Sequence, residues 1–347
     1  MKIKLLLIVL LVQSFQLTAQ ENTSVPIPDI ATIDQWRKEN NVPAIAIATI
    51  EQNKIKKIVV RGNTKENIPA TSKTVFDVAS LTKTITAILS LQLVSNGSLD
   101  LDEPLYPYWV DPDVKNDLVH KKLTTRHILS HTTGFKNWRR MYDDKKLAFD
   151  FEPGTKFQYS GEGFEYLRKA LEAKFKTSFE QLVDSLVFKP NNMMHSSLVW
   201  NKRMETSTFA NTHNKEGKPY SYDKATKANA ADNLLTTIED FGNIAVNILQ
   251  RKHLTEKMYV AMEHPQVVVK DGVHFGLGCI VLKDLPNGEY AIFNAGSDTG
   301  VNAIIIVLPK SKRGLIVFTN GDNGRALAMK MIAETLGDTG KEILSRF

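Results

Sequence analysis

The chain of 347 residues has a single cysteine, Cys279, so no disulfide can form within it. Cys279 lies in an apolar run typical of a β-strand, and we interpret it as a small core residue. The chain also lacks an apolar run of the ~20 residues that a membrane-spanning helix needs. It has no arginine-rich tract or basic stripe of the kind that nucleic-acid-binding proteins carry. These absences argue against a disulfide framework, stable membrane insertion and a nucleic-acid partner.

The first twenty residues have the pattern of a secretory signal peptide. Lys2 and Lys4 precede the apolar run Leu5 to Val12, and Ala19 is a candidate cleavage position. No cysteine lies nearby, which argues against a lipoprotein anchor. We therefore expect a periplasmic or secreted protein, with an uncleaved membrane tether as the alternative. Removal of residues 1–20 takes away two lysines and lowers the formal net charge from +6 to +4.

The order of the apolar segments predicts one antiparallel sheet with a helical insertion. Strand-like runs lie near both ends of the chain, at 44–50, 57–61, 276–282, 290–294, 302–308 and 314–319. Turn-forming residues separate several of them, at 51–54, 285–288 and 309–313. A helix near 33–40 and a final amphipathic helix should cover the sheet. The apolar face of the final helix consists of Leu327, Met331, Ile332 and Leu336.

Residues between these strands have mainly the character of helix and loop. We therefore divide the mature chain, 21–347, into an α/β layer formed by about 21–79 and 250–347, and a helical region of about 80–249. The sequence Thr236-Thr237-Ile238-Glu239 is a capping-box pattern before a helix at 241–249. A substrate would bind in the cleft between sheet and helical region.

A serine and a lysine stand at the start of a segment that predicts a core helix. Ser80 and Lys83 are three positions apart, which places them on one face of a helix. Residues 75–79 before them have an extended, apolar pattern, and the segment from Ile85 to Val94 is apolar nearly all round. A lysine one turn from a serine can act as its base. The alternative is a serine helix cap followed by a solvent-facing lysine.

Four ordered motifs favour the first interpretation. They are Phe76 to Lys83, Ile128 to Phe135, Pro153 to Gly161 and Asn294 to Gly300. In these motifs the chain resembles the serine β-lactamase and penicillin-binding-protein superfamily, especially its class C β-lactamases, D-Ala-D-Ala carboxypeptidases and β-lactamase-like esterases. The resemblance covers nearly all of the mature chain. It implies a β-lactamase/transpeptidase-like α/β (α+β) fold and a serine hydrolase that forms an acyl-enzyme.

The same resemblance assigns the catalytic groups. Ser80 is the expected nucleophile, and Lys83 and Tyr159 share the removal of its proton. Tyr159 matches the first residue of the family's Y-x-N motif, and its alternative is an ordinary aromatic at the core boundary. The backbone N–H groups of Ser80 and Ser297 would form the oxyanion hole.

The chain departs from the family pattern at two substrate-binding positions. Gly161 stands where Y-x-N has its asparagine, so a side-chain amide that contacts the substrate's acyl amide is missing. The next residue, Glu162, either replaces that polarity or is a solvated helix start. Asn294 stands where K-T-G or H-x-G has a cation, which predicts weaker binding of substrate carboxylates. Gly296 is kept and should let the substrate approach the backbone.

The histidines and acidic residues form no recognisable metal motif. His127 and His131 are four apart, but Ile128 replaces the glutamate of the zincin motif, and we assign His131 to a turn near the cleft. The sequence Asp322-Asn323-Gly324 lacks the repeated carboxylates of a calcium loop and predicts a turn and helix cap. We expect no metal and no cofactor.

The leading hypothesis is a secreted serine hydrolase, related to β-lactamases, that acts on a small ester or amide. Its partner would be a small-molecule ester, amide or peptide substrate. The enzymatic alternatives are a D-Ala-D-Ala carboxypeptidase and a β-lactamase, and the departures at Gly161 and Asn294 count against both. The non-enzymatic alternative is a pseudoenzyme that binds a ligand in the same cleft. The presence of Ser80, Lys83 and Tyr159 favours an enzyme.

Overall fold

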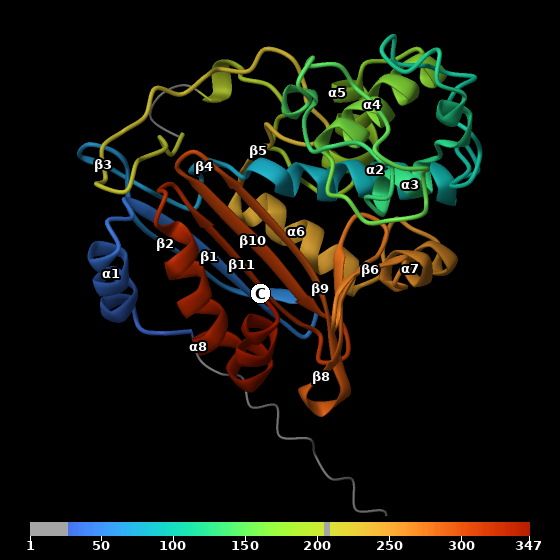
Figure 1. Ribbon diagram of the computed structural model, residues 1–347. Coiled ribbons are helices and arrows are strands. Elements are labelled where there is room, and N and C mark those ends of the chain that lie inside the picture. The colour runs from blue at the N-terminus through green and yellow to red at the C-terminus, as the bar shows by residue number, and fades with distance from the viewer. Residues whose placement is uncertain (1–26, 205–208) are drawn as a thin grey trace, which may run out of the picture.

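A large antiparallel sheet with helices on both faces forms the body of the computed structural model, which describes residues 27–204 and 209–347 (Figure 1). Within these residues the sheet has nine strands in the order β3-β2-β1-β11-β10-β9-β8-β7-β6. Its strands are β1 (Ala44–Glu51), β2 (Lys54–Lys65), β3 (Ile68–Pro69), β6 (Val267–Lys270), β7 (Val273–Phe275), β8 (Ile280–Leu285), β9 (Glu289–Asp298), β10 (Val301–Leu308) and β11 (Arg313–Thr319). The predicted signal peptide, residues 1–20, lies outside the described residues.

Helices cover the two faces of the sheet unequally. The terminal helices α1 (Ile30–Glu39) and α8 (Gly324–Ser345) lie on one face, while α6 (Ile238–Leu249) packs on the other, the same side as α2 (Thr82–Ser95) (Figure 1). The remaining helices are α3 (Thr125–Leu129), α4 (Gly161–Phe175), α5 (Phe179–Val183) and α7 (Glu256–Glu263). A separate two-stranded pair joins β4 (Val75–Asp77) to β5 (Leu235–Thr237). No helix within the described residues is long and apolar enough to cross a membrane.

The alternating pattern of β1 shows why this segment forms a central strand. Ile45 and Ile47 are buried against the terminal helices, whereas Ala44, Ala46 and Ala48 are buried on the opposite face, which α6 contacts. Small alanines let a helix lie close to the strand, and isoleucines fill the wider space on the other side. The strand is apolar from Ala44 to Ala48 because both of its faces are covered there.

Most of the predicted strands are confirmed, with one shift in position. The hairpin β1–β2 and the strands β9, β10 and β11 lie where the pattern placed them. The strand predicted at 276–282 begins only at Ile280, because the N–H of Gly276 donates to the carbonyl of Cys279 and closes a turn there. Cys279 is therefore a buried turn residue, 3% exposed, and burial raises the pKa of its thiol to about 12. The extended pattern at 75–79 contains β4, whereas the short strands β3, β5, β6 and β7 were not predicted individually.

The predicted helices are confirmed, with changes at two caps. The apolar face of the last helix, α8, packs against the sheet. Every residue of α2 from Thr82 to Leu93 is buried. The cap of α6 is Thr237 and not Thr236, because the Thr237 hydroxyl accepts from the N–H of Asp240. The Thr236 hydroxyl is instead buried against that of Ser196, at 2.7 Å. Asn323 holds the position before α8, but its side chain makes no capping hydrogen bond and instead donates to the carbonyls of Asn40 and Lys215.

Candidate active site

Ser80 and Lys83 lie side by side where the turn after β4 leads into α2. Ser80 belongs to a short 3₁₀ turn at Ala79–Leu81, and α2 begins at the following residue. The Nζ of Lys83 is 3.0 Å from the Oγ of Ser80. The lysine is only 4% exposed, so the alternative of a solvent-facing lysine after a serine cap is wrong. Their one-turn spacing brings an amine to the serine, as predicted.

Lys83 contacts groups from two distant parts of the chain, at Ala231 and at Tyr159 to Phe164. Its Nζ donates to the carbonyl of Ala231 at 2.9 Å. It lies 4.8 Å from the ring centroid of Tyr159 and 5.8 Å from that of Phe164. Within the described residues, no carboxylate lies within ion-pair distance of this amine. The structure thus brings together the three residues predicted to be catalytic, with the tyrosine ring beside the amine.

The turn that carries Ser80 has a constrained backbone. Ala79 has a φ of +46°, in the left-handed region that a residue with a Cβ rarely adopts. Its N–H donates to the carboxylate of Asp77 at 2.8 Å, and the hydroxyl of Tyr222 donates to the other oxygen of that carboxylate. Burial raises the pKa of Asp77 to about 7. Non-glycine residues in this conformation persist where surrounding contacts hold them, and such positions cluster at active sites.

Strand β9 passes directly against the Ser80 turn. A Cβ placed on Gly296 would lie 2.0 Å from the carbonyl oxygen of Val78 and 3.0 Å from the backbone nitrogens of Ser80 and Leu81. A larger residue than glycine at position 296 would therefore collide with the backbone of the Ser80 turn. The sequence had suggested a different reason for this glycine, namely that it lets the substrate approach the backbone. Ser297, the next residue, lines the same cavity as Ser80. The positions of these two residues permit the predicted oxyanion hole, which stays a prediction.

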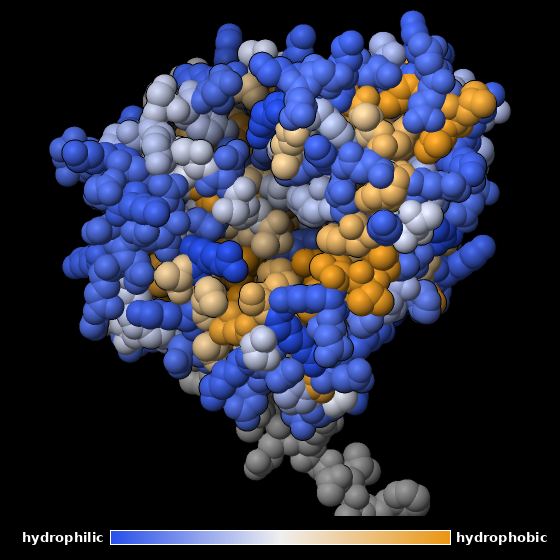
Figure 2. Space-filling model, in the orientation of Figure 1, coloured by the Kyte–Doolittle hydropathy of each residue, from blue (hydrophilic) through white to orange (hydrophobic). Residues whose placement is uncertain are grey.

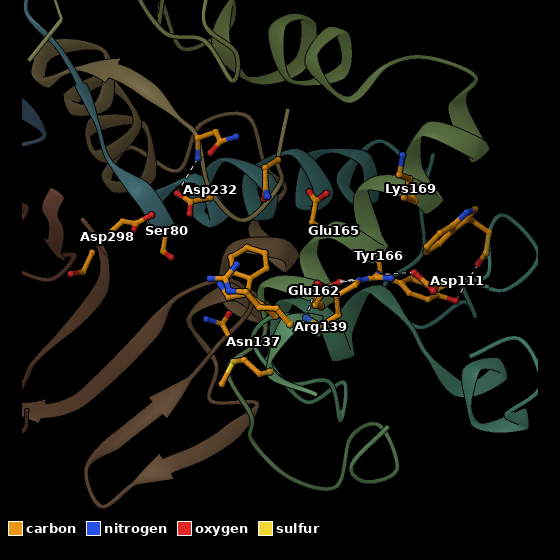
Figure 3. A pocket seen from close by; sticks show the side chains of 17 residues that line it. Ser80, Asp111, Asn137, Arg139, Glu162, Glu165, Tyr166, Lys169, Asp232 and Asp298 are labelled. Carbon is orange, nitrogen blue, oxygen red and sulfur yellow. Dashed lines mark hydrogen bonds and ion pairs between the residues drawn. The ribbon is translucent and has the colours of Figure 1, made fainter. Parts of the chain in front are cut away.

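A cavity of about 920 Å³ opens at Ser80 (Figure 3). The cavity lies between the turn of Ser80, the end of β9 and the helical region. Figure 2 shows that apolar residues are exposed near the centre of one molecular face. Its lining residues are Ser80, Trp109, Asp111, Asn137, Trp138, Arg139, Arg140, Met141, Glu162, Glu165, Tyr166, Lys169, Asn229, Asp232, Asn233, Ser297 and Asp298. Figure 3 shows Ser80, Asp232 and Asp298 at one end of this cavity, with Arg139, Glu162 and Asp111 at the other.

One arginine organises the end of the cavity away from Ser80. Arg139 forms ion pairs with Asp111 at 2.9 Å, Asp113 at 3.2 Å and Glu162 at 2.9 Å. Glu162 is 7% exposed and also accepts from the backbone N–H of Arg139. It is therefore a buried ion-pair partner, so the interpretation of a solvated helix start is wrong. The cavity end nearer to Ser80 contains Asp232, and burial raises the pKa of its carboxyl.

The sequence matches the Beta-lactamase family over residues 30–335. The chain belongs to the Beta-lactamase family. This membership supports a serine hydrolase of the β-lactamase and penicillin-binding-protein superfamily. The chain is 24% identical to a β-lactamase of Escherichia coli (strain K12) over 288 residues, which cover 78% of this chain and 74% of that protein.

Solved structures share the fold. An octameric penicillin-binding protein homologue from Pyrococcus abyssi superimposes with a TM-score of 0.75 at 20% identity, covering 90% of this chain and 79% of that one. A class C β-lactamase superimposes with a TM-score of 0.72 at 22% identity, covering 87% of this chain and 93% of that one. The β-lactamase/transpeptidase-like fold predicted from the motifs is therefore confirmed.

The two departures from the Beta-lactamase pattern have different structural settings. The amide of Asn294 donates to the hydroxyl of Thr84 at 2.8 Å and to the carbonyl of Gly278 at 2.9 Å. Asn294 therefore uses its amide hydrogens within the protein and does not line the Ser80 cavity. Gly161 is buried against the ring of Trp138, and it is Trp138 that lines the cavity.

His127 and His131, which lie four positions apart, are not paired with each other. The Nδ1 of His131 accepts from the backbone N–H of Ser160 at 3.0 Å, while that of His127 lies 3.2 Å from the hydroxyl of Thr124. His131 is fully buried, and its ring stacks 4.2 Å from the ring of Tyr159. Burial and the nearby Lys83 hold the pKa of His131 well below its usual range. Within the described residues, no three His, Cys, Asp or Glu side chains are grouped as metal ligands.

Sequence reasoning missed the walls of the cavity. Asn137, Trp138 and Arg139 come from the loop before α4, and Asp232 and Asn233 come from an irregular segment before β5. Neither segment carries a motif with a defined spacing. The adjacent tryptophan and arginines just after the Ile128 to Phe135 motif were the available signal, since such side chains are enriched in binding sites.

Proposed function

We propose that this member of the Beta-lactamase family is a serine hydrolase that acts through an acyl-enzyme at Ser80 on a small ester or amide. The observation that carries the proposal is the 3.0 Å contact between the Ser80 Oγ and the Nζ of a lysine that is 4% exposed. A serine hydroxyl needs an adjacent base to become nucleophilic. Lys83 is in hydrogen-bond reach, which is the geometric requirement for that base.

The proposed reaction has two steps. In the first, the Ser80 proton moves to Lys83 while Oγ bonds to the substrate carbonyl carbon, and the backbone N–H groups of Ser80 and Ser297 bind the resulting oxyanion. The bond to the leaving alcohol or amine then breaks, and the proton passes to that group with the help of Tyr159. In the second step water gives a proton to Lys83 and its oxygen bonds to the acyl carbon. The bond from that carbon to the Ser80 Oγ then breaks, the proton returns to Oγ, and the acid leaves. Removal of one oxyanion donor typically costs roughly 10²–10³-fold in rate.

Two observations support an ester or small amide over a carboxylate-bearing β-lactam. Asn294 carries no charge, and its amide already bonds Thr84 and Gly278. Gly161 has no side chain that could contact an acyl amide. A D-Ala-D-Ala peptidase or a β-lactamase needs substitutes for both groups. We also propose export of the protein through the signal-like residues 1–20.

The test is covalent labelling of the purified protein by a fluorophosphonate and by a fluorescent penicillin, with the modified residue located by mass spectrometry. We expect the fluorophosphonate on Ser80, no labelling in Ser80→Ala with unchanged circular dichroism, and p-nitrophenyl esters hydrolysed faster than nitrocefin. Ser80→Ala removes one hydroxyl from a cavity wall, so the fold should persist. An unlabelled wild type would instead support the pseudoenzyme, and strong penicillin labelling would support a peptidase or β-lactamase.

A further inference from the structure

The ring of Trp138 occupies the space in which a side chain at position 161 would lie. A Cβ placed on Gly161 would be 2.7 Å from Cη2 of Trp138 and 2.9 Å from both Cζ2 and Cζ3. Gly161 is the first residue of α4, with a helical backbone that any amino acid adopts. The neighbouring ring, and not the backbone conformation, therefore requires glycine at this position.

Hydrogen bonds hold the two neighbours of Trp138 against the start of α4. The N–H of Gly161 donates to the side-chain oxygen of Asn137 at 2.8 Å and to its carbonyl at 3.0 Å. The N–H of Glu162 donates to the same carbonyl at 2.9 Å, and the N–H of Arg139 donates to the Glu162 carboxylate at 2.9 Å. The residues on either side of Trp138 are thus bonded to the start of α4. Such a site presents its ring in a preorganised position.

Trp138 faces the same cavity as Ser80 and is only partly buried. The guanidinium of Arg140 lies 5.4 Å from its ring centroid. Trp109 and Tyr166 also line the cavity, packed edge to face with centroids 4.7 Å apart. The wall above Gly161 therefore offers a flat aromatic surface where a side-chain amide would have offered hydrogen bonds.

We propose that Trp138 is a specificity-determining residue of the Ser80 cavity and recognises a planar, aromatic group of the substrate by stacking. This inference rests on the proposed function of Ser80. Offset or edge-to-face packing against an indole stabilises an aromatic group beyond the effect of its buried area, whereas a flexible alkyl chain of similar size lacks this contribution. The substrate class is accordingly an ester or amide with an aromatic ring near the scissile carbonyl.

The first experiment measures inhibition by boronic acids, which form a tetrahedral adduct with a serine Oγ. The readout is the ratio of the inhibition constants of n-butylboronic and phenylboronic acid in wild type, Trp138→Phe and Trp138→Ala. We expect the wild type to prefer the phenyl compound. Trp138→Ala should lower the ratio by roughly 2–10-fold, the value of one aromatic contact, and Trp138→Phe should largely keep it. Trp36→Ala, on α1 at the opposite face of the sheet, is the matched control and should leave it unchanged.

A ratio unaffected by Trp138→Ala, with Ser80 still labelled by fluorophosphonate, overturns the inference alone. A wild type that neither reacts with fluorophosphonate nor binds either boronic acid overturns the proposed function and the inference with it.

The second experiment tests the steric relation between ring and glycine without using activity. Gly161→Ala should lower Tm in the wild-type background, because the new methyl group meets the Trp138 ring. In the Trp138→Ala background the same change should be neutral or raise Tm, since alanine is a better helix former than glycine. This reversal of sign is the signature of coupling between two neighbouring residues. If Gly161→Ala lowers Tm equally in both backgrounds, the Trp138 ring does not occupy the space of a side chain at position 161, and the proposal is contradicted.

Discussion

Gly296→Ala tests whether β9 must touch the turn that carries Ser80. The new Cβ would lie 2.0 Å from the carbonyl oxygen of Val78, a distance that has to open by about 1 Å or more before the contact becomes tolerable. Because that carbonyl is backbone, either β9 or the Ser80 turn must move. A displacement of about 1 Å at a catalytic group can cost roughly 10²-fold in rate. Overpacking of this kind also lowers the unfolding free energy by about 1–3 kcal/mol.

The assay is the second-order rate of fluorophosphonate labelling at Ser80, combined with urea unfolding of the same samples. Gly321→Ala is the matched control, because a Cβ there meets Pro43 at 3.4 Å, an ordinary contact. We expect the control to behave as wild type and Gly296→Ala to label about 10²-fold more slowly, the cost of a 1 Å misplacement. Wild-type labelling and stability in Gly296→Ala would refute the argument that this close approach positions the nucleophile.

Three further predictions concern the surroundings of the nucleophile. Lys83→Ala and Tyr159→Phe should each slow acylation by roughly 10²–10⁴-fold, and the double variant should lose much less than the product of the two; multiplicative losses in stopped-flow acylation would indicate independent roles. Asn294→Ala should lower the unfolding free energy in urea by about 1–3 kcal/mol, because it leaves a buried carbonyl without its donor, while Ser80 is still labelled; loss of labelling at full stability would instead indicate a catalytic role. Asp77, whose pKa rises from 3.8 to about 7 on folding, holds a proton in the native state that the unfolded chain loses, so stability should fall as pH rises through this window. Asp77→Asn should flatten that part of the unfolding free energy against pH, and an unchanged slope would show that another group is responsible.

The fold was predictable where apolar pattern and turn chemistry agreed. β1 and β10 are apolar on both faces and bounded by turn residues, so the pattern placed both of them. The extended pattern at 75–79 indicated β4, but its pairing with β5 could not be predicted, since each strand has three residues and they pair across more than 150 positions of the chain. The turn at Gly276–Cys279 was mistaken for a strand because its apolar residues fill the core in an irregular conformation.

The candidate site was predictable only to the extent that spacing carries information. Ser80 and Lys83 meet because one helical turn separates them, and that relation is local. Lys83 also donates to the backbone carbonyl of Ala231. Because the alanine side chain is a plain methyl group, the sequence gives no sign that this residue contributes to the site. The role of Trp138 depends on the absence of a side chain at Gly161, and no periodicity in either segment relates the two residues.

The contact between Lys83 and Ala231 also has a consequence for the order in which the protein matures. The two residues are 148 positions apart, so a growing chain presents Ser80 and Lys83 long before the carbonyl that holds the amine has been synthesised. Contacts between distant segments form late, because the loop between them must first close. The sequence motif therefore exists well before the site does. If Ser80 is the nucleophile, its reactivity reports that this long-range contact has formed.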